Sequence, residues 1–330
     1  MSVTVAAIIP THKRPELLAR AISSVLNQSK PVDEVIVIDD ASCDRTLNVV
    51  RSFKSNAVKY FRNPDVGASS SRNYGVQVAS CDFVAFLDDD DEWAPDKIKL
   101  QMAMVEEQNL DLCFTRIQIV YEGTNIRYLT NARMSENLAR DICIENCIGG
   151  TISSMIRREL FLSVQGFDLN FHAREEYDLW IRLIHAGARV GILEIGLSIA
   201  YRSLYNRKRI SSDVKKYENA IALLNTKYKS LIEESLSHDQ QSLRYRKQCE
   251  FLAAQAVSSG LRVAGFKYYV KYLQSRFNLK IAAMAMVCLV HPILLIRMRA
   301  LSGWVKSSTR PPRRHQSCRN MDDESEGLVR

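Results

Sequence analysis

The sequence lacks a glycine-rich phosphate loop. Neither GxGxxG nor GxxxxGKS/T occurs in its 330 residues, which excludes a dinucleotide fingerprint and a P-loop. None of the eight cysteines forms a CxxC pair or shows the Cys/His spacing of a zinc site. A signal peptide is missing as well, because Met1 to Thr4 run straight into an apolar segment. We therefore expect reduced thiols and a cytoplasmic protein.

Carboxylates are scarce in the last part of the chain. Residues 1–200 carry 21 Lys and Arg against 27 Asp and Glu, a net charge of −6, whereas residues 201–330 carry 24 against 10, a net charge of +14. This asymmetry suggests two tasks, and the basic part suits an anionic membrane surface or nucleic acid. No aromatic-interleaved basic patch or known binding module accompanies the charge, so we expect no nucleic-acid partner.

A hydrophobic run of membrane-spanning length is also absent. The sixteen residues 281–296 carry no formal charge, but as a helix they would span roughly 24 Å against a hydrocarbon core of ~30 Å. Basic residues flank both ends, whereas a spanning helix normally shows a bias to one side. We favour an interfacial helix that docks on the anionic cytoplasmic leaflet, with a buried core helix as the alternative. Residues 307–330 are polar and mixed in charge, and we expect disorder there.

The most informative stretch that is present joins a buried strand to four carboxylates. Residues 83–87 form a short apolar run, which predicts a strand buried on both faces, and Asp88 to Asp91 follow at once. Two carboxylates ~5 Å apart repel by roughly 3 kcal/mol at an effective dielectric constant of ~20, so four in a row require a compensating cation. Oxygen ligands of this kind suit Mg²⁺ or Mn²⁺. A solvated acidic loop is the alternative, but a site at the carboxyl edge of a sheet is favoured.

Strands alternate with helices through the first hundred residues. We expect strands over 3–9, 34–38, 58–61 and 83–87, with helices over 17–26, 44–53 and 68–79 between them. This alternation predicts an α/β fold with a mostly parallel, doubly wound, Rossmann-like sheet. Apolar residues at three-four spacing predict helices over 213–277, an α-helical appendage.

Five segments together resemble the glycosyltransferase family 2 domain, which has the GT-A fold. They are AAIIPTHKRPELLARAISSVLNQ, EVIVIDDASCDRT, NPDVGASSSRNYGVQVA, FVAFLDDDDEWAPDKI and GFDLNFHAREEYDLWIRL. The resemblance covers about residues 1–205 and implies a catalytic domain there. We expect a basic, helical, membrane-associating region over 206–306 and a tail over 307–330.

The resemblance also implies roles for individual residues. A divalent cation, Mn²⁺ or Mg²⁺, would be held by the DxD carboxylates Asp88 and Asp90. The nucleotide-sugar donor, with a UDP-sugar favoured, would be bound by Pro10, Thr11, Asp39, Asp40, Arg72, Asp89 and Asp91. From the residues alone, Asp39 and Asp40 could instead cap the next helix, and Arg72 could be a solvated helix residue.

A second acidic cluster opens the segment Glu175 to Leu183. Carboxylates in a first helical turn also complement the helix dipole, which is the structural alternative. In the family the second residue of a Glu-Asp pair is the general base, and here that pair is Glu-Glu, so Glu176 takes the position with a side chain one methylene longer. Glu175 and Asp178 are the fallback candidates.

A histidine that the family often has after the strand near residue 202 is missing here. Residues 207–209 are basic instead, and we hypothesise that they neutralise the leaving diphosphate.

The expected activity is inverting transfer of a sugar to an acceptor hydroxyl. A saccharide or lipid-linked saccharide acceptor, as in cell-surface polysaccharide or lipopolysaccharide assembly, is inferred by analogy with the family. The enzyme would work at the inner face of the cell membrane. One alternative is a nucleotidyltransferase, although PTHKRP lacks the glycines it would need. The other is a non-catalytic protein that binds sugar nucleotides or serves as a scaffold.

Overall fold

The structure, a computed structural model, describes residues 3–40, 44–203, 213–291 and 293–298. Three expectations lie outside these ranges: the domain boundary near residue 205, the basic run 207–209 and the tail 307–330. The domain division therefore stays a prediction.

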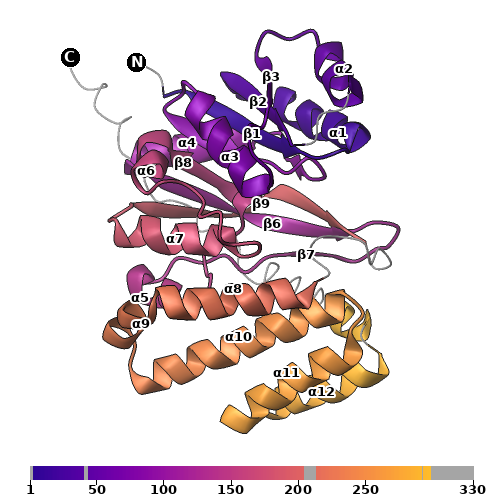
Figure 1. Cartoon of the computed structure of the whole chain (residues 1–330), viewed down its shortest axis with the longest axis vertical. Coiled ribbons are helices and arrows are strands. Elements are labelled where there is room, and N and C mark those ends of the chain that lie inside the picture. Colours follow the sequence, from indigo (N-terminus) through magenta and orange to yellow (C-terminus); the bar gives the residue numbers. More distant parts are fainter. Residues whose placement is uncertain (1–2, 41–43, 204–212, 292, 299–330) are drawn as a thin grey trace, which may run out of the picture.

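Nine strands in the described part of the chain form one sheet (Figure 1). They are β1 Val5–Thr11, β2 Glu34–Asp39, β3 Val58–Arg62, β4 Phe83–Phe86, β5 Glu92–Trp93, β6 Leu112–Tyr121, β7 Arg127–Leu129, β8 Ser154–Arg157 and β9 Val190–Arg202. Their order is β3-β2-β1-β4-β8-β6-β9-β5, and β7 pairs with β6.

Helices alternate with the strands and cover both faces of the sheet. After β9 the described part of the chain contains helices only. The helices are α1 Pro15–Leu26, α2 Asp44–Ser52, α3 Ala68–Val78, α4 Lys97–Gln108, α5 Leu138–Ile144, α6 Arg158–Ser163, α7 Glu175–His185, α8 Val214–Lys227, α9 Lys229–Ser235, α10 His238–Ser258, α11 Arg262–Ser275 and α12 Leu279–Val290.

The sheet is mixed: most of its paired residues lie in parallel ladders, as expected, and shorter antiparallel ladders join them. The pairs β1–β2, β1–β4, β2–β3 and β6–β9 are parallel. The pairs β4–β8, β6–β8, β6–β7 and β5–β9 are antiparallel. The α/β class is confirmed, and parallel pairing holds for β1 to β4, where each crossover contains a helix. Beyond β4 the strand β8 enters beside it in the opposite direction, so the alternation of the first hundred residues does not extend to the whole sheet.

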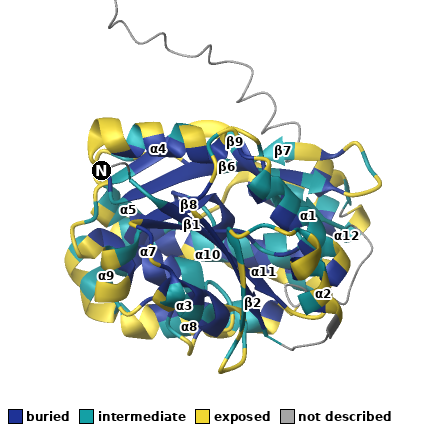
Figure 2. Cartoon of the chain, turned by 90° about the horizontal axis from the view of Figure 1, so that it is seen from above, coloured by how far each residue is buried: buried dark blue, intermediate teal, exposed yellow. Residues whose placement is uncertain are grey.

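Alternate residues of β1 face two different cores, as the period of a strand requires. Ala6 and Ile8 pack with residues of α3 and α7, whereas Ala7 and Ile9 pack with residues of α1 and α4. Figure 2 shows the strands dark blue between helices whose outer faces are exposed. The carboxyl ends of β1, β2 and β4 therefore meet at one edge between two helical layers.

Helices α8 to α12 gather at one end of the molecule (Figure 1). A third core joins them to the sheet, because residues of β6 and β9 cluster there with residues of α8, α10, α11 and α12. We call α8–α12 the helical region. It packs directly against the distal part of the long strands β6 and β9.

The apolar stretch 281–296 combines features of both expectations for it. On α12, Ile281, Ala285 and Cys288 are buried in the third core, as in a core helix. On its other side Met286 is 61% exposed and Val290 is 75% exposed, as in an interfacial helix. Among the described residues, no helix has both the length and the apolar character needed to cross a bilayer.

Gly75 of α3 provides a test of this packing. A Cβ at this position would lie 2.5 Å from Ile8 Cγ2 in β1, so α3 can approach the sheet this closely only with glycine. We expect Gly75→Val to lower the free energy of unfolding by about 2–3 kcal/mol through overpacking, measured by urea denaturation. Gln77→Val, at an exposed position of the same helix, controls for the helix propensity of valine and should cost less than about 1 kcal/mol. Equal losses for both variants would contradict the packing argument.

Candidate active site

Four consecutive carboxylates lie where β4 ends, and we call Asp88–Asp91 the acidic edge. Carboxylate oxygens of Asp88, Asp90 and Asp91 all lie within 4.8 Å of one another. Such crowding costs several kcal/mol unless cations lie close by. The structure supplies those cations in the form of arginine side chains.

Arg72 joins the acidic edge to the second acidic cluster. Its guanidinium lies 2.6 Å from Asp88 Oδ1 and 3.2 Å from Glu175 Oε1, and the side chain is buried. Burial alone would lower the pKa of Arg72, but the charges of Asp88 and Glu175 outweigh it and raise the pKa above the ordinary value. Arg72 thus brings together the two acidic groups that the sequence places about ninety residues apart.

Arg14, at the N-cap of α1, and Arg20, within α1, bring positive charge to the middle of the acidic edge. Arg14 lies 2.6 Å from Asp89 Oδ1 and 2.8 Å from Asp90 Oδ2. Arg20 donates to the backbone carbonyl of Asp90 over 2.6 Å. These contacts explain how the acidic edge is tolerated in a folded protein without further groups.

Two members of the acidic edge are buried. Asp89 accepts a hydrogen bond from Thr11 Oγ1 at 2.7 Å, and burial, opposed in part by Arg14, raises its pKa to about 6. Asp91 accepts from the backbone N–H of Tyr201 at 3.0 Å, and burial, reinforced by the neighbouring aspartates, raises its pKa to about 8. An additional positive charge at this edge would stabilise the ionised forms of both.

The residues of the acidic edge fit a hard divalent cation. Asp88, Asp90 and Asp91 each use one carboxylate oxygen for a contact with a described residue. The second oxygen of each has no hydrogen bond or ion pair with the described residues, and oxygen-only donors suit Mg²⁺ or Mn²⁺. Asp91 thus lies in one carboxylate group with Asp88 and Asp90, the two ligands expected from the sequence, and this group could hold a metal ion.

The ends of β1 and β2 lie beside the acidic edge. Pro10 and Thr11 are buried at the end of β1 and pair with Ile38 and Asp39 of β2. Asp39 is buried and accepts a hydrogen bond from the hydroxyl of Tyr60 in β3.

Asp40 accepts from the backbone N–H of Gly67 and from Asn63 Nδ2, each at 2.9 Å. It therefore holds the loop that leads into α3, the helix of Arg72.

Glu175 and Glu176 form the first turn of α7, which faces the acidic edge through Arg72. Glu175 receives the Arg72 hydrogen bond. Burial, and then the charge of Glu175, raise the pKa of Glu176 to about 7. A carboxyl group with a pKa near the working pH is suited to accept a proton from a hydroxyl group.

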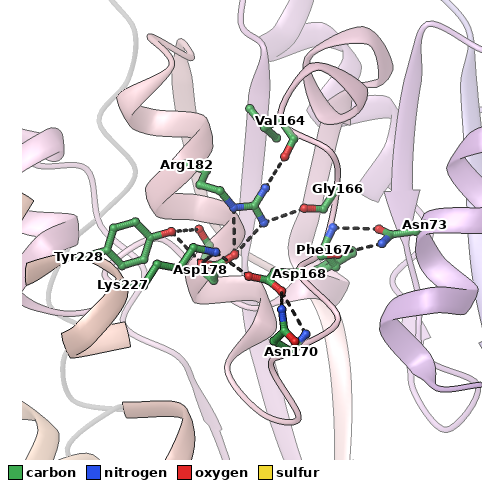
Figure 3. Close-up of polar contacts among 10 residues, drawn as sticks. All are labelled: Asn73, Val164, Gly166, Phe167, Asp168, Asn170, Asp178, Arg182, Lys227 and Tyr228. Carbon is green, nitrogen blue, oxygen red and sulfur yellow. Dashed lines mark hydrogen bonds and ion pairs between the residues drawn. The ribbon is translucent and has the colours of Figure 1, made fainter. Parts of the chain in front are cut away.

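Asp178 lies in a different environment, which argues against its fallback role as base. Its side chain is completely buried and lies 2.7 Å from Arg182, from Lys227 and from the hydroxyl of Tyr228 (Figure 3). Arg182 also donates to the carbonyls of Val164 and Gly166. Asp178 thus anchors α7 to α8 and to the turn before residue 167.

Residues 6–164 match the family model described as Glycosyl transferase family 2. This segment of the chain therefore has the sequence pattern of a glycosyltransferase family 2 domain. An uncharacterized glycosyltransferase of Haemophilus influenzae is 25% identical over 300 residues, 89% of this chain and 98% of the relative. The GalNAc(5)-diNAcBac-PP-undecaprenol beta-1,3-glucosyltransferase of Campylobacter jejuni is 27% identical over 301 residues, 87% of this chain and 92% of the relative. The solved structure of S. aureus TarS 1-349 in complex with UDP-GlcNAc covers 91% of this chain and 92% of that chain, with a TM-score of 0.58 and 17% identity. This likeness shows that the fold is GT-A.

Several residues that shape the site of this glycosyltransferase were not singled out from its sequence. Arg14 lies just beyond the end of β1, and parallel strands bring that end to the acidic edge, so the position of Arg14 was a sequence signal for its role, whereas Arg20 lies further along within α1. Asn73 exchanges two hydrogen bonds of 2.8 Å with the backbone of Phe167. It thereby fixes the turn before α7 against α3, and the sequence signal for it was its place next to Arg72 in the segment NPDVGASSSRNYGVQVA.

The anchoring role of Asp178 gives a prediction. Asp178→Asn leaves Arg182 and Lys227 without their shared buried carboxylate, so the free energy of unfolding should fall by about 3 kcal/mol. Urea denaturation measures this, and Glu194→Gln, which breaks an exposed pair with Arg116, serves as the control with a loss below about 1 kcal/mol. An Asp178→Asn protein as stable as this control but inactive would reassign Asp178 to the chemistry.

Proposed function

We propose that this glycosyltransferase transfers a sugar from a nucleotide-diphosphate sugar to an acceptor hydroxyl in one inverting displacement. The observation that supports this best is the bridge through Arg72. This bridge joins the acidic edge, suited to the donor diphosphate and its cation, to Glu175, and the neighbouring Glu176 is a carboxyl suited to deprotonate a hydroxyl.

On the donor side, Thr11, Asp39 and Asp40 would bound the nucleotide, with a UDP-sugar as the favoured donor. Asp90, Asp88 and Asp91 would hold Mg²⁺ or Mn²⁺, and when bound this cation neutralises charge on the departing diphosphate. Arg72 lies beside the same edge and would face the phosphate groups or the sugar.

On the acceptor side, Glu176 would take the proton of the attacking hydroxyl as the new bond forms. Glu175 is held by Arg72, so Glu176 is the member of the pair left for this task. The acceptor proposed is a lipid-linked saccharide in cell-surface polysaccharide synthesis, because the Campylobacter relative is named for a substrate on undecaprenol diphosphate.

Donor turnover tests the reaction directly. Purified protein with UDP-, GDP- and dTDP-sugars, Mn²⁺ or Mg²⁺, and a membrane lipid extract as acceptor should release nucleotide in a metal-dependent manner. Asp90→Asn should lower the rate about 100-fold, and Glu176→Gln should lower it about 100-fold or more. Asp65→Asn, in an exposed loop, should match the wild type. Binding of a donor without release under any of these conditions would favour a non-catalytic sugar-nucleotide-binding protein.

We also propose that the helical region rests on an anionic membrane surface at the inner face of the cell membrane. On α12, Leu279, Met286 and Val290 follow an i, i+7, i+11 spacing, which puts them on one exposed face. Phe277, just before this helix, is 74% exposed.

The charge around this face supports an anionic lipid partner. No Asp or Glu occurs between residues 251 and 321. The described residues of this stretch include six basic ones, Arg262, Lys267, Lys271, Arg276, Lys280 and Arg297. An apolar face flanked by basic side chains and free of carboxylates is complementary to anionic headgroups above an acyl layer.

Vesicle sedimentation tests the membrane proposal. The full chain should bind phosphatidylglycerol-containing vesicles and should bind pure phosphatidylcholine vesicles much less. The double variant Phe277→Ser, Leu279→Ser should bind about tenfold more weakly or worse, because each buried apolar side chain contributes about 1.5–3 kcal/mol. Val66→Ser, at a residue 80% exposed in the first half, is the control. Equal binding by all variants, or self-association instead of vesicle binding, would overturn this proposal.

A further inference from the structure

Arg174 immediately precedes the acidic pair Glu175–Glu176 and sits in the left-handed region, with φ of 58°. Its guanidinium carbon lies 4.6 Å from the ring centroid of Tyr177 and 4.1 Å from that of Phe251. Its Nε is buried and has no hydrogen-bond partner. Arg174 is therefore held by aromatic rings and not by a hydrogen-bonded carboxylate among the described residues.

The ring that covers Arg174 comes from the helical region. Phe251 belongs to α10, and Tyr217 of α8 packs edge-on against it, with ring centroids 5.4 Å apart and planes at 74°. Arg244, also from α10, donates to the Tyr177 hydroxyl at 3.4 Å. Two helices of the helical region thus reach the first turn of α7, where the candidate base is located.

The charged and titratable groups that act on Glu176 come from three helices and the residue before α7. Glu175 is its neighbour on α7, Arg72 faces it from α3, Arg174 precedes the helix, and Tyr217 faces it from α8. Arg72 already forms ion pairs with Asp88 and Glu175. Arg174 has no such pair among the described residues, so its charge acts on Glu176 without being neutralised by a closer carboxylate.

A buried guanidinium without a hydrogen-bonded carboxylate is costly, because aromatic faces compensate its desolvation only in part. The charge of Glu176, two residues further along the chain, favours the protonated guanidinium and so offsets part of this cost. Of the causes that act on Glu176, Arg174 is the strongest that favours the ionised form.

We propose that Arg174 is a positioning residue for the candidate base, and that Phe251, against which Tyr217 packs, holds its guanidinium in place, so that the helical region acts on Glu176. The inference rests on the proposed role of Glu176. It gives the helical region a part in the reaction that is separate from membrane docking.

The ionisation of Glu176 can be measured without knowledge of the acceptor. The full chain is labelled with ¹³C at the glutamate carboxyls, and the resonance that is missing in Glu176→Gln reports Glu176. In the wild type this resonance should titrate near pH 7. In Arg174→Gln the midpoint should rise by about one unit or more, because a nearby cation favours the ionised form by that amount.

Four further variants complete the experiment. Phe251→Leu, which removes the ring and keeps an apolar side chain, should raise the midpoint in the same direction by a smaller amount. Phe251→Tyr and Arg174→Lys, which keep the ring and the charge respectively, should stay near the wild type. Tyr245→Leu, at a half-exposed residue of α10, is the matched control and should show no shift. If Arg174→Gln does not fold, the Glu176 midpoint measured in Phe251→Leu decides the test.

The outcomes separate this inference from the proposed function. An unchanged Glu176 midpoint in both Arg174→Gln and Phe251→Leu overturns the inference. If the Glu176 midpoint shifts in Arg174→Gln but not in Phe251→Leu, the role of Phe251 is overturned and the effect of Arg174 on Glu176 stands. If the midpoints shift as expected but Glu176→Gln transfers sugar at the wild-type rate, the proposed base is wrong while the electrostatic coupling stands.

Discussion

The repulsion among Asp88–Asp91 is the constraint on which the arrangement of this site depends. Four carboxylates at the end of a buried strand require positive charge, and two helices bring it: Arg14 and Arg20 at the N-cap and in the middle of α1, and Arg72 in α3. Each of these helices follows a strand of the parallel part of the sheet, so the topology delivers the arginines to the carboxyl edge. Arginines of the same chain thereby offset the repulsion among the four carboxylates, and carboxylate oxygens remain available to a ligand.

Ion pairs of arginine side chains also connect the acidic edge to the rest of the molecule. Arg72 reaches the start of α7, whose position is fixed from behind by Asp178, Arg182 and Lys227. Because Lys227 belongs to α8, the helical region contributes to the placement of α7 even before any role of Arg174 is considered. The glycosyltransferase is thus better understood as one cooperative unit around α7 than as a catalytic domain with a passive appendage.

Much of this arrangement could be predicted from the sequence, and the remainder could not for identifiable reasons. The apolar runs that end in Asp39 and Asp88 predicted two strands and a common edge, because parallel strands end together. Sequence reasoning assigned the compensating charge at Asp88–Asp91 to Mg²⁺ or Mn²⁺, and that assignment stays a prediction. Local sequence could not show that Arg14 and Arg72 also supply positive charge there, since these contacts are set by tertiary packing. The antiparallel direction of β8 could not be predicted, because so short a strand carries no sequence signal for its direction. Asp178 has the same acidic, first-turn pattern as Glu176, and only its tertiary contacts with Arg182, Lys227 and Tyr228 distinguish it.

The central claim is that the acidic edge holds a divalent cation together with the donor diphosphate, and crystals soaked with UDP and Mn²⁺ test it most directly. Anomalous scattering at the manganese edge locates the ion independently of its ligands. The account predicts one anomalous peak among the carboxylates of Asp88, Asp90 and Asp91, in contact with the diphosphate of UDP. A bound UDP whose diphosphate lies on Arg14 and Arg72, with no anomalous peak at the acidic edge, would contradict it.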